Sequence, residues 1–449
     1  MNKVIKLTKG LDIPMEGKAE QQVISLPQPE VFAIVPDHYA GIKPKMLVRE
    51  GDVVKAGSAL FCDKSHESML FVSPVSGKVI AVERGDRRKV MAIRIEADKE
   101  IEYEHFATEV KSGEDVKALL LKAGMWSYLK QRPYDCIAMP EKSPKAVFIS
   151  AFDSAPLAPD YDFVVKGQTN ALQAAVDALS KIAPVYIGVK AGAVAAEWAS
   201  LKHCTLTEFA GPHPAGNVSV QINHVLPIAK GETVYTVNAQ DLLIIGRFMT
   251  TGKVDMHRMV ALTGPKATTL AYFSILPGMP IESLIQSHLQ SDEAVRVIEG
   301  NPLSGHKAEL NEIMEPALNQ VTAIAEGTEA RDFLGWIMPR TDNFSLNNAV
   351  VGKWLAKLGR KHFRFDARLL GGRRAIITSG EYDKVFPMDI YPEYLIKAMI
   401  AGNLDRMEQL GAYEVAPEDF ALCEYVCTSK MPLQAIVRQA LDNMKAELE

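Results

Sequence analysis

The hydrophobic pattern of the chain changes near residue 112, and the regions on either side of this point must fold differently. Before it, short apolar runs alternate with glycine-containing turns, as in Val31–Val35, Met46–Gly57 and Ser73–Ile80. After it, an amphipathic helical pattern over 114–123 is followed by a buried apolar run over 146–150. The first pattern is typical of compact β-hairpins. The second is typical of strands that alternate with helices around a parallel sheet.

The length of 449 residues suits roughly three domains of about 150 residues each. The third region begins with a predicted strand pair, Met259–Gly264 and Thr269–Phe273, followed by a predicted helix over Ile281–Gln290. We therefore predict a multidomain α/β and β protein. Its parts are a biotinyl/lipoyl-like barrel-sandwich domain (1–105), a Rossmann-like domain without a nucleotide loop (106–255), a β-grasp module of the soluble-ligand-binding type (256–330) and a helical C-terminal domain (331–449).

Charge and composition exclude several classes of function. A net charge of −5 does not favour nucleic acid as a partner. The five cysteines are scattered rather than arranged as a disulfide framework, which favours a reducing compartment. The N-terminus lacks the apolar core of a secretory signal. Apolar runs such as Asp241–Ile245 have the length of a strand and fall short of the about 18 residues that a membrane-spanning helix needs.

The second domain should carry any nucleotide site, because glycines there would let backbone N–H groups approach phosphates. Neither G-x-G-x-x-G nor G-x-x-x-x-G-K-[ST] occurs in the chain. In the expected place, Gly124 is followed by Met125, Trp126 and Tyr128, which are bulky. Two interpretations stay open. The rings of Trp126 and Tyr128 either fill the space, or line a cleft for another flat ring such as a quinone.

Two cysteines near the C-terminus follow part of an iron–sulfur pattern. A ferredoxin run has the form C-x₂-C-x₂-C-x₃-C-P, and Cys423 and Cys427 supply its last two thiols. Pro417 and Phe420 occupy the places of the first two, and Thr428 replaces the final proline. Two thiolates cannot hold a [4Fe–4S] cluster, so we interpret the pair as the remnant of a lost motif. The alternatives are a buried core pair or a centre shared with a partner subunit.

No other cofactor or metal motif is present. The ten histidines show no H-x-x-x-H spacing, so no metal site is predicted. In the barrel, Lys64 lacks the flanking methionines of a lipoyl or biotinyl carrier, so we expect the barrel to have a structural role. No catalytic residue and no cofactor-binding residue is assigned from these patterns.

Basic residues concentrate between Lys353 and Arg374, where eight lysines and arginines accompany a single acid, Asp366. Such a block suits anionic lipid headgroups or an acidic partner. It equally suits a solvated face that pairs with the acidic tail beyond residue 375. The sequence does not decide between these roles.

The order of the predicted parts resembles that of the flavin-and-NADH-binding subunit of respiratory complex I and of the C subunit of Rnf-type electron-transport complexes. The sequence departs from both at the glycine loop and at the cysteine set. Several segments instead resemble the A subunit of the Na⁺-translocating NADH:quinone oxidoreductases over essentially the whole chain. These segments are Lys9–Pro14, Ser73–Val79, Phe209–Gly216, Val260–Pro265 and Tyr425-Val-Cys-Thr-Ser-Lys-Met-Pro-Leu433.

The resemblance implies a peripheral subunit on the cytoplasmic side of the bacterial inner membrane, docked on the membrane subunits of a sodium-pumping NADH:quinone reductase. The whole complex passes electrons from NADH to a ubiquinone-type quinone and exports Na⁺. Its flavins and iron–sulfur centres are expected in other subunits, with none in this chain. The expected role is assembly and support of quinone reduction. A pure scaffold without substrate contact is the alternative.

Overall fold

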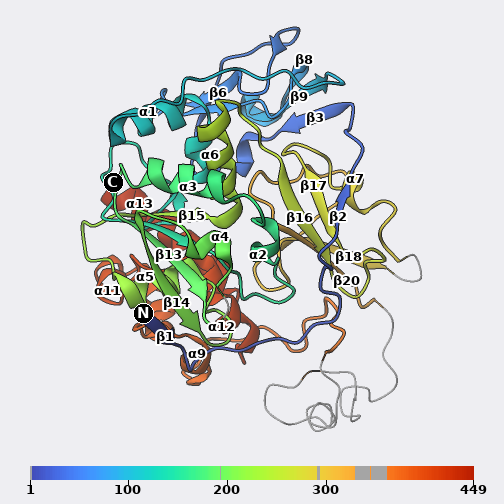
Figure 1. Ribbon diagram of the computed structural model, residues 1–449. Helices are drawn as coiled ribbons and strands as arrows, with labels where there is room; N and C mark the ends of the chain where they lie inside the picture. Colours follow the sequence, from blue (N-terminus) through green and yellow to red (C-terminus); the bar gives the residue numbers. More distant parts are fainter. Residues whose placement is uncertain (1–2, 193, 291–293, 329–343, 345–361) are drawn as a thin grey trace.

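Figure 1 shows the computed structural model, which describes residues 3–192, 194–290, 294–328, 344 and 362–449. The barrel lies at the top of this view, a larger mixed sheet lies below it, and a second mixed sheet lies to the right. The C-terminal helices pack behind the first of these sheets. Within the described residues, no helix combines the length and apolar character needed to cross a membrane.

The first unit consists of two small antiparallel sheets, which confirms the predicted barrel-sandwich. One sheet has the order β3-β9-β8-β5 and the other β4-β6-β7. Phe61 and Phe71 stack in its core with ring centroids 4.7 Å apart, and the edge of Tyr39 meets both rings. The elements are β3 (Val31–Ile34), η1 (Pro36–His38), β4 (Pro44–Met46), β5 (Val53–Val54), β6 (Ala59–Asp63), β7 (Leu70–Val72), β8 (Gly77–Arg84), η2 (Asp86–Arg88) and β9 (Val90–Ala97).

The second unit is built on a seven-stranded sheet with the order β1-β14-β13-β12-β15-β10-β11. The first five strands in this order, β1, β14, β13, β12 and β15, are parallel to one another. β10 and β11 extend the sheet in antiparallel fashion. Their bounds are β1 (Lys3–Lys6), β10 (Lys130–Arg132), β11 (Cys136–Ile137), β12 (Val147–Ser150), β13 (Val185–Lys190), β14 (Cys204–Ala210) and β15 (Val234–Asn238).

Both faces of this sheet are covered, because alternate residues of β12 point to opposite sides. Val147 and Ile149 belong to the core that contains α3 and α6, whereas Phe148 belongs to the core that contains α5 and the C-terminal helices. A parallel sheet buried on both faces reads as a continuous apolar run, as residues 146–150 do. The helices and turns are α1 (Gly113–Lys122), η3 (Met125–Tyr128), α2 (Tyr161–Val164), α3 (Thr169–Leu179), α4 (Ala196–Ala199), α5 (Val218–Val225) and α6 (Ala239–Thr251).

The segment Asp241–Ile245, whose apolar run has the length of a strand, lies in the helix α6. The side chain of Asn238 caps this helix by accepting a hydrogen bond from the N–H of Gln240. The helix is buried nearly all round, so it lacks the polar stripe that normally reveals helical periodicity. α6 also approaches α3 closely, since a Cβ on Gly246 would lie 1.9 Å from the carbonyl oxygen of Ala171.

The third unit is a six-stranded sheet with the order β19-β18-β20-β16-β17-β2. β16 and β17 form the predicted strand pair, which is antiparallel, although β17 begins at Tyr272 rather than at Thr269. The predicted helix Ile281–Gln290 is wrong in extent, because α7 covers only Glu282–Ile285. Backbone hydrogen bonds from Thr268 to His288 and from Gln290 to Lys266 draw the following residues into an extended pairing. The strands are β2 (Val23–Ser25), β16 (Arg258–Thr263), β17 (Tyr272–Ile275), β18 (Val295–Glu299), β19 (His306–Lys307) and β20 (Gln320–Ala325).

From Glu381 onward the C-terminal region is mainly helical, as expected, whereas the described residues 362–380 contain no helix. Its helices share one core with the second unit. They are α9 (Glu381–Val385), α10 (Pro392–Ile400), α11 (Leu404–Gln409), η4 (Pro417–Phe420), α12 (Ala421–Val426) and α13 (Leu433–Leu448).

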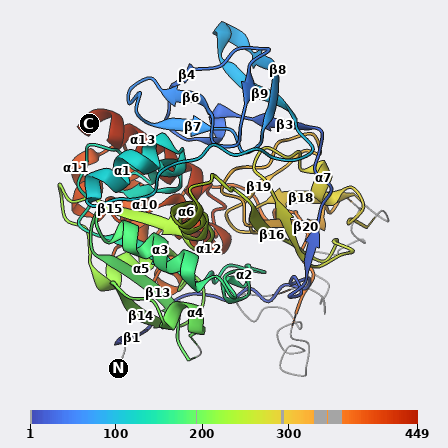
Figure 2. The ribbon, with the colours of Figure 1, turned by 45° about the horizontal axis from the view of Figure 1, so that its top comes forward.

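The first residues of the chain join sheets other than the barrel. β1 pairs with β14 of the second unit, and β2 pairs with β17 of the third. Figures 1 and 2 both place the N-terminus at the opposite end of the molecule from the barrel. The predicted limits of the four domains stay predictions.

Candidate functional site

A hollow of about 390 Å³ opens where β12 and β15 end, at Ser150 and Asn238. The chain leaves β12 toward β13 on one side, while β15 pairs with β12 on the other. In open sheets of parallel strands, ligands bind at such a reversal, outside the carboxyl ends of the strands. We call this space the switch-point hollow.

The wall of the switch-point hollow combines aromatic rings with charged and amide side chains. The aromatic members offer flat surfaces, and the polar members offer hydrogen bonds. The main lining side chains are Tyr128, Phe152, Tyr161, Lys130, Arg132, Asp135, Asp153, Asn238, Asp241 and Glu418.

Arg132 organises the charges at one end of the hollow. Its side chain is 2% exposed, and its Nη1 donates to Oδ1 of Asp135 over 2.6 Å. Its Nε donates to Oγ of Ser219, and its Nη2 lies 3.8 Å from Oε1 of Glu418. Burial raises the pKa of Asp135, but the charges of Arg132 and Lys130 outweigh burial and hold that pKa below its ordinary value.

Glu418 is a carboxyl group of the wall whose pKa is shifted toward neutral pH. Burial, together with the negative charges of Asp419 and Asp135, raises its pKa to about 7. Its side chain nevertheless keeps 48% exposure, because it projects into the hollow. A carboxyl group that titrates near pH 7 can give a proton to a bound ligand or take one from it. The sequence could not single it out among 55 acidic residues.

Trp126 is sealed in the core and does not line the switch-point hollow. Its side chain is fully buried, its Nε1 donates to the carbonyl oxygen of Ala138 over 2.7 Å, and its ring meets Tyr235 edge-on. Gly124, at φ 72°, begins this turn, and a Cβ there would lie 2.7 Å from the side chain of Val72 in the barrel. The turn is therefore closed by protein on both sides.

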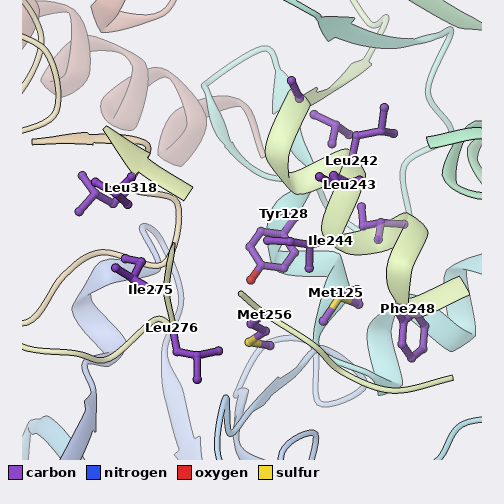
Figure 3. Close-up of a cluster of buried hydrophobic side chains, with 14 of the residues drawn as sticks. Met125, Tyr128, Leu242, Leu243, Ile244, Phe248, Met256, Ile275, Leu276 and Leu318 are labelled. Carbon is purple, nitrogen blue, oxygen red and sulfur yellow. The ribbon is translucent and has the colours of Figure 1, made fainter. Parts of the chain in front are cut away.

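Tyr128 does reach the wall of the switch-point hollow. Figure 3 shows it within a cluster of buried apolar side chains, with Met125 and Ile244 near it. Burial raises the pKa of its phenol, so the hydroxyl stays protonated and can donate a hydrogen bond. The structure thus brings one of the two predicted aromatic residues to the hollow and leaves the other behind it.

Cys423 lies within α12 and Cys427 follows its last residue as the C-cap, and both are almost fully buried. The Cys427 sulfur accepts a hydrogen bond from the hydroxyl of Tyr382 over 2.9 Å and another from the N–H of Met431 over 3.4 Å. Burial raises the pKa of the Cys423 thiol well above its ordinary value. This pair suits a packed core.

The residues present do not fit a four-thiolate cluster. The three remaining cysteines lie on β6, β11 and β14, at positions 62, 136 and 204. Among the residues that the structure describes, no group of three or more histidine, cysteine, aspartate or glutamate side chains is placed to hold a metal ion. A [4Fe–4S] cluster needs four ligands.

A larger hollow of about 780 Å³ lies over the neighbouring strand ends, where residues 12–15, 151–162 and 189–192 line it. Burial lowers the pKa of His213 to about 4, so its ring is neutral at pH 7. The Ser154 hydroxyl and Nδ1 of His213 share a hydrogen bond over 3.0 Å, whose direction depends on the tautomer of the ring, and the same hydroxyl accepts from the N–H of Gly216 over 2.8 Å. These bonds fix the loop after β12, and no sequence pattern other than the segment Phe209–Gly216 points to them.

The basic stretch from Lys353 to Arg374 lies partly outside the described residues, since 353–361 are not among them. Of the remainder, Arg364 pairs with Glu16 over 2.8 Å, and Arg368 pairs with Asp366. Neither ion pair involves the acidic tail. The proposed roles of the stretch stay predictions.

These observations define a class: a protein with a barrel-sandwich unit, an α/β unit with a hollow at its switch point, a third mixed sheet and a helical end. Three family models match the chain, and they follow one another in the same order as these units. They describe an NqrA N-terminal barrel-sandwich hybrid domain over residues 5–98, an NqrA second alpha/beta domain over 111–254 and an NQRA C-terminal domain over 259–309.

Full-length relatives are similar throughout. The A subunit of the Na(+)-translocating NADH-quinone reductase of Pasteurella multocida (strain Pm70) is 35% identical, and the alignment spans 99% of this chain and 100% of that one. The proteins of the same name from Neisseria meningitidis serogroup B and Serratia proteamaculans are 33% and 35% identical over the same shares. The chain belongs to the family of A subunits of the Na⁺-translocating NADH-quinone reductases, which confirms the expected resemblance.

A solved NAD⁺-reducing [NiFe]-hydrogenase in its H₂-reduced state is also similar, at 10% identity and a TM-score of 0.37 over 76% of this chain and 62% of that one. A likeness this low carries no argument.

Proposed function

We propose that the chain is a peripheral, cytoplasmic-face subunit that contains no redox cofactor and supports quinone reduction in the sodium-pumping complex. In this proposal its second unit is a Rossmann-like domain without a nucleotide loop, and its third is a β-grasp module. NADH, flavins and iron–sulfur centres belong to the other subunits. Membrane subunits are its partners, and a ubiquinone-type ring is its ligand.

The closed turn Met125–Tyr128 is the observation that carries the cofactor-free part. A flavin or dinucleotide phosphate needs free backbone N–H groups in an open glycine loop. Here Gly124 packs against the side chain of Val72, and the indole N–H of Trp126 donates a hydrogen bond to the carbonyl oxygen of Ala138. The buried thiols of α12 support the same conclusion for iron.

The switch-point hollow supports the quinone part. Tyr128, Phe152 and Tyr161 provide aromatic surface, and the Tyr128 hydroxyl can donate a hydrogen bond to a quinone oxygen. Quinone reduction consumes two protons for two electrons. Glu418, which titrates near pH 7, is suited to supply one of them.

Analysis of the purified full chain tests the first part. We expect no flavin absorbance and no iron at a stoichiometric level. Stoichiometric flavin or iron retained by the isolated chain would overturn the cofactor-free proposal.

Titration with a short-chain ubiquinone analogue, followed by tryptophan fluorescence, tests the second part. We expect saturable quenching, and Tyr128→Ala should weaken the apparent affinity at least tenfold. The matched control is Tyr394→Ala, because Tyr394 is 58% exposed on α10, outside the hollow. Equal affinities for wild type and Tyr128→Ala would contradict quinone binding here and favour the pure scaffold.

A further inference from the structure

Large apolar side chains gather on the surface between residues 369 and 400. Fourteen large hydrophobic side chains of the described residues are exposed, and six of them lie in this short stretch. Single exposed apolar side chains are ordinary, whereas a group of them is typical of a surface that binds a partner or a membrane. The six are Leu369, Leu370, Ile377, Tyr391, Tyr394 and Ile400.

The two leucines belong to a loop without regular secondary structure, residues 369–377, which is nevertheless attached to the fold. Ile376 packs against the core of the C-terminal helices, and the N–H of Arg374 donates to the carbonyl oxygen of Ser429 over 2.8 Å. The leucines are 60% and 57% exposed, and every residue from 369 to 375 is exposed. The loop therefore holds two large aliphatic side chains in solvent although its base is fixed.

The same loop carries positive charge that nothing nearby in the sequence compensates. Arg373 and Arg374 are exposed, and neither side chain has an ion-pair or hydrogen-bond partner in the described part of the chain. No acidic residue occurs from 369 to 379. Lys430 adds a third positive charge close to the loop, because a Cβ on Gly371 would lie 3.4 Å from its side chain.

The outer face of α10 adjoins the loop. Nζ of Lys397 donates a hydrogen bond to the hydroxyl of Thr378, directly after the loop, and lies 6.0 Å from the centre of the Tyr394 ring. The edge of the Tyr391 ring meets Tyr394 with centroids 6.2 Å apart, and the two rings are 68% and 58% exposed. We call the loop and this face the apolar-basic surface. Its members are Leu369, Leu370, Arg373, Arg374, Ile377, Tyr391, Tyr394 and Lys397.

The composition of the apolar-basic surface fits an anionic bilayer better than a protein partner. Aliphatic side chains enter the boundary of the acyl chains, tyrosine rings favour the level of the headgroups, and lysine and arginine attract anionic lipids. Protein interfaces are depleted in lysine, and leucine rarely carries their binding energy. The exposed Asp389 lies two residues before Tyr391, so the excess positive charge belongs to the loop.

We propose that the apolar-basic surface lies against an anionic lipid surface. Leu369 and Leu370 enter the boundary of the acyl chains, and Arg373 and Arg374 contact the lipid phosphates. The proposal rests on the peripheral membrane position proposed above and is independent of quinone binding. A small apolar contact with a few charges binds weakly and reversibly, so the loop orients a subunit that its protein partners hold in place.

Sedimentation of the full chain with lipid vesicles tests the proposal. The two probes are vesicles of phosphatidylcholine alone and vesicles of phosphatidylcholine mixed with phosphatidylglycerol. We expect stronger binding to the anionic vesicles, and we expect it to weaken as salt is added, because salt screens exposed charges. Equal binding to the two kinds of vesicle, or none to either, would overturn the proposal. The vesicles hold no quinone, so neither result bears on the quinone titration.

Two double variants locate the contact. Leu369→Ser combined with Leu370→Ser should lower the partition coefficient at least about tenfold, because both side chains lose apolar burial. Arg373→Gln combined with Arg374→Gln should lower it about fivefold per charge at low salt, and by less at high salt. All four side chains are exposed, so the variants should fold.

Matched controls lie on other units. Leu310→Ser removes a leucine that is 55% exposed in the third unit. Arg87→Gln combined with Arg88→Gln removes an adjacent pair of exposed arginines from the barrel. Both controls should keep the wild-type partition coefficient. Losses in the controls equal to those in the loop variants would show unspecific attraction and would overturn the assignment of the surface.

A protein partner for the same surface would give a different result. Membranes that contain the remaining subunits, stripped of this chain, provide the comparison. If wild type binds these membranes but not vesicles, and the Leu369 and Leu370 double variant binds neither, the surface is a protein docking site and the lipid proposal is wrong. The proposed peripheral position would stand in that case. Wild type that binds neither membranes nor vesicles would contradict both proposals.

Discussion

The turn Met125–Tyr128 stands where a nucleotide loop would be, and the helix α12 carries the remnant of a cluster motif. The two regions pack differently. The turn borders a hollow with charged walls, and one of its rings reaches that hollow. The cysteines of α12 are buried, and one sulfur is hydrogen-bonded by Tyr382. A motif departing from its usual form can thus leave an accessible site in one region and a closed core in another.

The largest expected effect tests whether Trp126 is a core residue. Trp126→Ala should lower the free energy of unfolding by about 3–5 kcal/mol, because it opens a cavity and leaves the Ala138 carbonyl without its donor. Urea unfolding measures the loss. The exposed control Tyr394→Ala should change stability by less than about 0.5 kcal/mol. A loss below about 1 kcal/mol for Trp126→Ala would mean that the turn is open rather than sealed.

The second prediction concerns the closed thiol region. Cys427→Ala should cost about 1–3 kcal/mol, because the buried Tyr382 hydroxyl loses its acceptor. Tyr382→Phe should recover part of this loss in the double variant, with a coupling of at least about 0.5 kcal/mol. Unfolding of all four proteins completes the cycle. Additive losses would contradict the hydrogen bond.

The third prediction returns to the accessible region and concerns pH. In the folded protein the pKa of Glu418 is raised from 4.5 to about 7, so folding favours its protonated form. The stability that this contributes is full below about pH 4.5 and is lost as pH rises through 7. Glu418→Gln should remove this loss. The free energy of unfolding of the wild type should therefore fall, relative to that of the variant, by about 1 kcal/mol between pH 4.5 and 8, after allowance for solvent screening.

Denaturant midpoints at several pH values measure the difference between the two proteins. Glu299, whose pKa burial also raises to about 7, remains in both and cancels. Parallel pH profiles for wild type and Glu418→Gln would show that the carboxyl group is not perturbed.

The smallest expected effect sharpens the contrast within the turn itself. Tyr128→Phe removes only a hydroxyl and keeps the packed ring, so we expect a stability change below about 1 kcal/mol. Trp126→Phe, which removes a hydrogen bond and volume from the sealed side, should cost more. The two variants are compared by the same unfolding assay. A greater loss for Tyr128→Phe would reverse the assignment of sealed and accessible sides.

Local patterns predict the elements whose signals are periodic. The helix α1 and the strand β12 lie within one residue of the expected ranges, because one has a clear apolar stripe and the other a continuous apolar run. The helix α6 escapes prediction, since burial on all sides removes its periodicity. The extent of α7 is overestimated because backbone bonds to distant Lys266 and Thr268 decide where it ends.

The site is less predictable than the fold. The sequence points to Trp126 and Tyr128 together, but which ring faces the hollow depends on how the turn packs against the barrel. Glu418 lies close to Arg132 and Asp135, which are far away in the chain, so no local spacing marks it. The strand pairings of β1 and β2 also cannot be predicted from local patterns, because their partners β14 and β17 lie far away in the chain.

Those two pairings have a consequence for biosynthesis. Lys3 pairs with Thr207 and Val23 with Tyr272, so the first strands leave the ribosome well before their partners exist. At a translation rate of roughly 5–20 residues per second, the time between the synthesis of each strand and that of its partner is about 10–50 seconds. During translation these edges stay unpaired, and a tag fused to the N-terminus would be attached directly to a segment that must still find its place in the sheet.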